Sequence, residues 1–165
     1  MKRIGTVALV SAIAVLIGLV GVAMASPPTI ASGTANQTGI TDLEVRMGGP
    51  NVIIEQTTVG VVSGTLSGTF EDTFKVVLHP NGRFTAHGSG SCECTVNGVT
   101  GVIQYVTSDT GEEVNGVPTF EGRQVITGAT GGLSGLRGVV QIEGTVDLGT
   151  GLANNTYSGA IHTHP

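Results

Sequence analysis

The chain has 165 residues and a formal net charge of −5, and only 12% of its residues are charged. This acidic and sparsely charged composition argues against binding of nucleic acids or anionic lipids, since both need clustered Lys and Arg. Glycine is abundant, with 27 residues, and tryptophan is absent. A composition rich in Gly, Thr and Val favours β-structure with many turns over helices.

The first 25 residues have the features of a secretory signal peptide. Lys2 and Arg3 give a positive start, residues 4–22 are almost wholly apolar, and residues 23–25 (Ala-Met-Ala) form a cleavage site before Ser26. A run of ~20 apolar residues can also span a bilayer, so an uncleaved membrane anchor is the alternative. We expect cleavage and therefore a secreted or extracytoplasmic protein, whose mature chain has five basic and twelve acidic residues.

Residues 26–40 are small and polar, and we interpret them as a flexible leader before a folded domain at residues 41–165. Within that domain, alternation of apolar and polar residues predicts seven or eight antiparallel strands. A long, acidic and turn-rich loop is expected at residues 108–118. The predicted strands lie at residues 41–47, 52–62, 65–78, 83–96, from 99 to that loop, 119–127, 139–148 and 157–162.

Two turns predict how three of these strands pair. Residues 79–83 (His-Pro-Asn-Gly-Arg) fit a three-residue loop with Gly82 in the left-handed conformation, which keeps the apolar faces of both strands aligned. Asn97-Gly98 is the favoured pair for a type I′ turn. Followed along the strands, these turns predict two rows on the inner face: Phe70–Cys92–Ile103 and Asp72–Gly90–Tyr105.

Asp72 is the only charged residue on the apolar face of residues 65–78. Across Gly90 it is expected to meet Tyr105, whose hydroxyl is a natural hydrogen-bond donor for a buried carboxylate. The pair is either a structural contact or a polar group at a ligand pocket, with the pKa of Asp72 raised by burial. The candidate interior residues are Asp72, Tyr105, Phe70, Cys92 and Ile103.

Cys92 and Cys94 point to the same side of one strand, in a compartment that oxidises thiols if the signal peptide is real. On a regular strand their Cα atoms would lie ~6.6 Å apart, so a disulfide would need a bulge. Two buried free thiols are the alternative. No metal site and no cofactor are expected, because no histidine shares that face, and His162 with His164 supplies too few ligands.

Residues 128–138 (Gly-Ala-Thr-Gly-Gly-Leu-Ser-Gly-Leu-Arg-Gly) contain five glycines between two strand-like segments. Leu133 and Leu136 are three residues apart, so one helical turn would lay both over the open end of a sheet. The absence of G-x-G-x-x-G and of Gly-Lys-Ser/Thr argues against a phosphate-binding loop. The pattern predicts a short plug.

This stretch resembles the G-T-G-x-L-x-G-L-R-G signature of secreted bacterial proteins in the allene oxide cyclase-like barrel superfamily, which is distantly related to plant dirigent proteins. The resemblance covers roughly residues 55–163. It implies an all-β fold, a single antiparallel barrel with a short glycine-rich helical turn near one end, and an apolar pocket. An immunoglobulin-like sandwich is the alternative fold. No stretch matches the catalytic residues of allene oxide cyclases.

We therefore expect a secreted or surface-tethered barrel that binds a small apolar ligand in its interior. Its partners include no nucleic acid, and it contacts a membrane only through residues 4–22 if these are not removed. An isomerase or cyclase of the same superfamily is one alternative, and a non-catalytic extracellular structural module is another. A cavity smaller than ~300 Å³ would favour the structural module.

Overall fold

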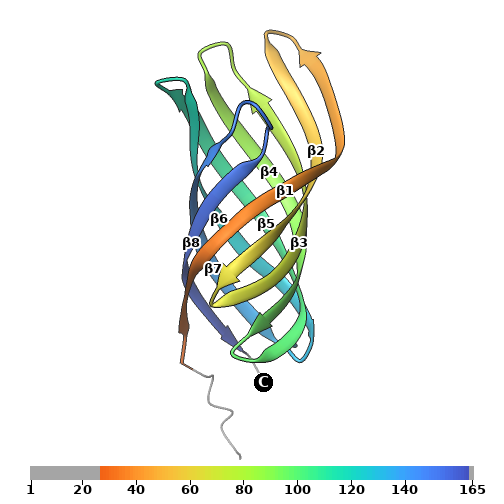
Figure 1. Cartoon of the computed structure of the whole chain (residues 1–165), viewed down its shortest axis with the longest axis vertical. Helices are drawn as coiled ribbons and strands as arrows, with labels where there is room; N and C mark the ends of the chain where they lie inside the picture. The colour runs from red at the N-terminus through yellow and green to blue at the C-terminus, as the bar shows by residue number, and fades with distance from the viewer. Residues whose placement is uncertain (1–26, 164–165) are drawn as a thin grey trace, which may run out of the picture.

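The computed structural model describes residues 27–163 (Figure 1). Eight antiparallel strands follow one another in chain order and form a closed barrel, which confirms the expected all-β architecture. Among these residues there is no helix, and hence none long and apolar enough to cross a membrane. The predicted signal peptide and His164 lie outside the described residues. The strands are β1 (Thr29–Gly48), β2 (Asn51–Gly64), β3 (Leu66–Leu78), β4 (Arg83–Val96), β5 (Val99–Val114), β6 (Val117–Gly131), β7 (Leu136–Val146) and β8 (Ala153–Thr163).

Residues 29–40, which we expected in a flexible leader, instead belong to β1. The ladder from Thr29↔Ile161 to Asn36↔Asn154 joins β1 to β8 and closes the ring. The small and polar residues of this segment suggest a flexible chain, but in β1 the small residues point inward and the polar ones outward. Ala31 is fully buried, and Gly33 leaves the space that the ring of Tyr157 occupies. The folded domain therefore begins at Thr29.

The prediction of a long acidic loop at residues 108–118 is also wrong. β5 and β6 run through this region and are joined by Asn115-Gly116, whose φ angles are 54° and 81°. The turn at Asn97-Gly98 has nearly the same pair of angles, 51° and 80°. Positive φ at both central residues is the type I′ geometry that suits a tight hairpin. Asp109 therefore lies in strand β5 of the barrel wall and not in a loop.

The register predicted for β3, β4 and β5 is confirmed. Gly82 has a φ of 78°, and its N–H donates to the carbonyl of His79 at 3.0 Å, as the three-residue loop requires. The two inner rows form as expected: Phe70 opposite Cys92 and Cys92 opposite Ile103, and Asp72 opposite Gly90 and Gly90 opposite Tyr105.

Large inward side chains lie across glycines that pair with them on the adjacent strand. A Cβ added to any of these glycines would collide with the neighbouring side chain. An eight-stranded barrel has an interior just wide enough for its side chains, so a large residue needs a small neighbour. The pairs are Phe70 with Gly60, Phe74 with Gly88, Phe84 with Gly111, Phe120 with Gly144, Tyr157 with Gly33, Asp72 with Gly90, and Asp109 with Gly122.

One end of the barrel, at the bottom of Figure 1, carries the turns β2–β3, β4–β5 and β6–β7, and we call it the closed end. Leu133 and Leu136 are 4% and 3% exposed there, as the plug requires. The expected helical turn does not form. Residues 132–135 make two successive hydrogen-bonded turns instead, because Gly131 and Gly135 take left-handed φ angles of 65° and 82°.

A disulfide between Cys92 and Cys94 lies next to this plug. Their Cα atoms are 5.3 Å apart, well inside the range of a disulfide. The bulge that we expected for such a bridge is absent, since the register between β3 and β4 runs unbroken past both cysteines. Gly68 lies opposite Cys94, and a side chain there would collide with the β4 backbone. The close approach of the two strands thus depends on glycine.

Candidate functional site

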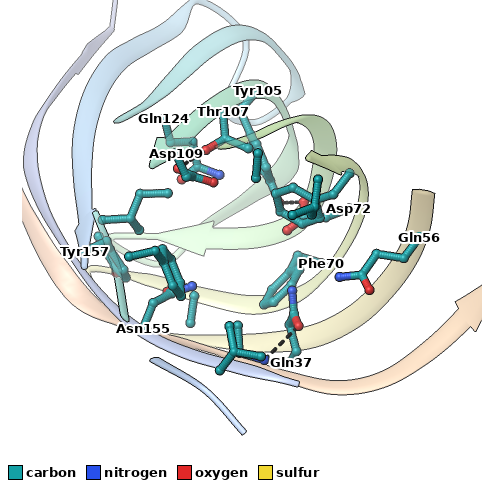
Figure 2. Close-up of a pocket in the computed structure, with 18 of the residues that line it drawn as sticks. Gln37, Gln56, Phe70, Asp72, Tyr105, Thr107, Asp109, Gln124, Asn155 and Tyr157 are labelled. Atoms are coloured by element: carbon teal, nitrogen blue, oxygen red, sulfur yellow. Dashed lines mark hydrogen bonds between the residues drawn. The ribbon is translucent and has the colours of Figure 1, made fainter. Parts of the chain in front are cut away.

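A cavity of about 370 Å³ occupies the barrel interior. All eight strands contribute to its mostly aliphatic and aromatic lining, and the five residues predicted for the interior (Asp72, Tyr105, Phe70, Cys92 and Ile103) are all part of it. Polar side chains from several strands converge on its middle (Figure 2). These are Gln37, Gln56, Asp72, Tyr105, Thr107, Asp109, Gln124 and Asn155.

Asp72 and Tyr105 meet across Gly90, as the register predicts. Their exposed fractions are 8% and 7%, and the Tyr105 hydroxyl donates to Oδ1 of Asp72 at 2.5 Å (Figure 2). So short an O–H···O contact is typical of a hydrogen bond to a charged acceptor. Because Gly90 has no side chain, the carboxyl and the ring both lie over it.

The environment shifts the pKa values of both groups. Burial raises the pKa of the Asp72 carboxyl to about 6; the Tyr105 hydrogen bond opposes this rise, and the negative charge of Asp109 adds to it. Burial, followed by the charge of Asp72 and the hydrogen bond to it, raises the pKa of Tyr105 above its ordinary value. Near neutral pH the tyrosine is therefore the donor, and the aspartate is close to its titration point.

Asp109 is a second buried carboxyl that the sequence analysis missed. It is 5% exposed, lies over Gly122, and accepts a hydrogen bond from the Thr107 hydroxyl at 2.9 Å. Burial raises its pKa to about 6, while the Thr107 hydrogen bond and the charge of His87 act in the opposite direction. Two signals would have found it: the turn pair Asn115-Gly116, and the inward alternation that continues from Tyr105 through Thr107.

Phe70, Cys92 and Ile103 form the floor of the cavity. Their exposed fractions are 7%, 4% and 1%, and they belong to the same buried cluster as the plug leucines. Beside them, the Tyr157 hydroxyl accepts a hydrogen bond from the Leu66 N–H at 2.9 Å. The row predicted from the hairpins thus forms the bottom of the cavity, next to the plug.

The opposite end of the barrel, at the top of Figure 1, carries the turns β1–β2, β3–β4, β5–β6 and β7–β8. We call it the mouth, because the cavity extends to Gly82, Pro118 and Gly151 there. Beyond Asn36, β1 no longer pairs with β8; irregularities follow in its pairing with β2, and the β1–β2 hairpin leans away from the ring (Figure 1). Leu43 pairs with Gln56 and Val45 with Ile54, both of which line the cavity. Leu43 and Val45 therefore continue the inner face, yet they are 54% and 57% exposed.

The ionisable groups that line the cavity are all acids or tyrosines. Asp72, Asp109 and, near the mouth, Glu113 belong to the lining, and no Lys, Arg or His of residues 27–163 does. Within that range no three His, Cys, Asp or Glu side chains are grouped so that they could hold a metal ion. The arrangement can accept hydrogen bonds, bind positive charge and exchange a proton near neutral pH.

Comparison with known proteins bears on the fold. No family model matches the chain, and no curated protein does. Among solved structures, a protein of unknown function from the DUF3224 family of Shewanella oneidensis MR-1 matches with a TM-score of 0.56 and 15% identity, over 84% of this chain and 99% of that one. The pterocarpan synthase dirigent protein GePTS1 matches with a TM-score of 0.48 and 13% identity, over 84% of this chain and 92% of that one. The chain therefore shares the fold of the Shewanella protein.

Proposed function

We propose that this protein is a secreted or surface-tethered β-barrel that binds a small, mostly apolar ligand in its interior. The cavity of about 370 Å³ carries this proposal. Its volume lies within the range of small-molecule sites, ~300–1,000 Å³, and such sites combine apolar walls with a few convergent polar groups. A plugged floor and an exposed apolar rim at the mouth suit a ligand that enters from one side only.

In this proposal Phe70, Cys92 and Ile103 contact the apolar body of the ligand, and the pair Asp72–Tyr105 orients a polar group on it. Native mass spectrometry of protein purified from its own host should detect a co-purified small molecule. In vitro, the neutral probe N-phenyl-1-naphthylamine should fluoresce when it enters the cavity.

The variant Ala86→Leu tests whether the probe binds inside. Ala86 lines the cavity and is 6% exposed, so a larger side chain there takes up ligand space. We expect probe affinity to fall at least about tenfold, which corresponds to ~1.4 kcal/mol. Thr85→Leu, one residue along on the outer face, is the matched control. Equal probe affinity in both variants would contradict the proposal.

The pair Asp72–Tyr105 also favours a second candidate, an isomerase or cyclase. A carboxyl with a pKa near 6 can give or take a proton at neutral pH, and the adjacent phenol can donate a hydrogen bond to a developing charge. Tyr105→Phe separates the roles of the pair. Loss of stability with unchanged binding of the co-purified ligand indicates a structural pair, whereas loss of binding or turnover indicates a functional one.

Secretion is proposed from residues 1–25, whose charge, apolar run and cleavage site fit a signal peptide. Intact mass measurement of the native protein should give an N-terminus at Ser26. Recovery of the uncleaved chain in the membrane fraction would instead indicate tethering through residues 4–22.

A further inference from the structure

The negative charge of the cavity restricts the kind of ligand that can bind in it. Asp72 and Asp109 both project into it, and no basic side chain of the described residues lines it. Three of the basic residues make ion pairs with exposed or half-exposed glutamates outside the cavity: Arg46 and Lys75 with Glu55, and Arg83 with Glu112. A buried carboxylate is costly unless a cation or several donors compensate it.

The protein compensates these carboxyls only in part. Tyr105 donates to Asp72, and Thr107 donates to Asp109. An ionised carboxylate can accept about four hydrogen bonds, so capacity remains at each of them for donors on a ligand.

A second observation points to a ligand that donates hydrogen bonds. Among the described residues, Oγ1 of Thr58 and Oδ1 of Asn155 are the buried side-chain oxygens or nitrogens without a hydrogen-bond partner. Thr58 is 0% exposed and pairs with Asp72 on the inner face, and Asn155 lines the cavity. Oδ1 of Asn155 can only accept a hydrogen bond, whereas the Thr58 hydroxyl can accept or donate one. The lining therefore has an unpaired acceptor and negative charge to spare, beside the amide donors of Gln56, Gln124 and Asn155.

We propose that the natural ligand carries a protonated amine on an apolar body, and that Asp72 and Asp109 hold the ammonium group while the aromatic and aliphatic walls contact the rest. An ammonium group has up to three N–H donors and one positive charge, so it satisfies both requirements together. A carboxylate ligand of the same shape would meet two like charges. This inference rests on the proposed function of the cavity as a ligand site.

Three probes with the same chain length and different head groups test it: octylamine, octanol and octanoate, each titrated against bound N-phenyl-1-naphthylamine at pH 7.5 in physiological salt. We expect octylamine to bind at least about tenfold more tightly than octanol, with octanoate the weakest, because one compensated charge contributes ~1.4 kcal/mol or more. Asp72→Asn and Asp109→Asn should each reduce the preference for octylamine over octanol.

Glu71→Gln is the matched control. Glu71 is the outward neighbour of Asp72 on β3, and the substitution removes one negative charge from the outer surface only. It should leave the octylamine preference unchanged, whereas an equal loss in this variant would show non-specific attraction and overturn the inference. The wild-type series decides the question even if a variant fails to fold.

Acidification supplies a further check, since protonation of Asp72 and Asp109 should reduce the octylamine preference as the pH falls below about 6. The groups that act on the Asp72 carboxyl are Tyr105 and Asp109, and those that act on Asp109 are Thr107 and, from the outer face of β4, the charge of His87. Octanol binding as tightly as octylamine would overturn the amine inference and leave the apolar-ligand function standing. Failure of all three probes to bind would overturn both.

Discussion

The two ends of the barrel are built from the same alternating strands, yet one is packed and the other is not. At the closed end, Leu133 and Leu136 are 4% and 3% exposed beside the Cys92–Cys94 bridge. At the mouth, Leu148 and Met47 are 66% and 67% exposed. Strand patterning alone does not distinguish these ends. The difference comes from the turns, because the β6–β7 turn carries its leucines back over the opening and the mouth turns do not.

Between the ends lies a belt of buried polar side chains that includes Asp72, Tyr105, Thr107 and Asp109. Apolar side chains would stabilise the fold more at the positions of Asp72 and Asp109. Burial raises the pKa of both carboxyls, which shows that their charged forms are unfavourable inside the barrel. Proteins tend to keep such costly groups where a site needs them. The closed end therefore accounts for stability, and the belt with the mouth accounts for the proposed binding.

The largest expected effect contrasts the two ends directly. Leu133→Ala or Leu136→Ala should lower the free energy of unfolding by about 2–5 kcal/mol, as truncations of buried leucines do. Leu148→Ala at the mouth should change it by less than about 0.5 kcal/mol, because that side chain is mostly exposed. Urea denaturation measures both. Equal losses at the two ends would show that the mouth is also packed.

The polar belt should make stability depend on pH. The pKa of both Asp72 and Asp109 rises from 3.8 to about 6 on folding, so between these values the folded state binds more protons than the unfolded state. The free energy of unfolding should therefore fall as the pH rises from about 4 to above 6, by on the order of 3 kcal/mol for each group. Asp72→Asn and Asp109→Asn should each flatten this slope, and Glu71→Gln should not. A wild-type stability that rises across this window would contradict the assignment.

The glycines beneath the carboxyls should tolerate no side chain. Gly90→Ala and Gly122→Ala place a Cβ against Oδ1 of Asp72 and Asp109, and each should cost about 1–3 kcal/mol in unfolding free energy, as overpacking does. Gly39→Ala is the control, because its Cβ would make only an ordinary contact, 3.5 Å from Cγ2 of Val59. Equal free energies of unfolding in all three variants would contradict the close packing of the two carboxyls against Gly90 and Gly122.

The smallest effect concerns a turn at the mouth. Gly82→Val should destabilise by ~1 kcal/mol or more, because a β-branched residue is strained at the φ of 78° found there. Gly82→Asn should cost less, since asparagine tolerates the left-handed region. Thermal unfolding of the two variants gives the comparison, and a valine that is as well tolerated as asparagine would contradict the left-handed assignment.

Features that depend on local chemistry can be predicted from the amino-acid sequence. The turns at Gly82 and Asn97-Gly98 specify their own geometry, and a period of two residues then carries the register along the strands. This is why the contact between Asp72 and Tyr105, two strands apart, was predictable. Asp109 was equally within reach, because Asn115-Gly116 is the same turn signal, and it was missed only because the acidic composition around it suggested a loop.

Other features depend on contacts between segments that are far apart in the chain. The pairing of β1 with β8 joins residues at opposite ends of the chain, and the small residues of β1 resemble a linker until Tyr157 packs over Gly33. The divergence of the β1–β2 hairpin at the mouth depends in the same way on closure of the ring, since it starts where the pairing of β1 with β8 ends. Closure sets the tilt and stagger of all eight strands together, and no local pattern in the sequence encodes it.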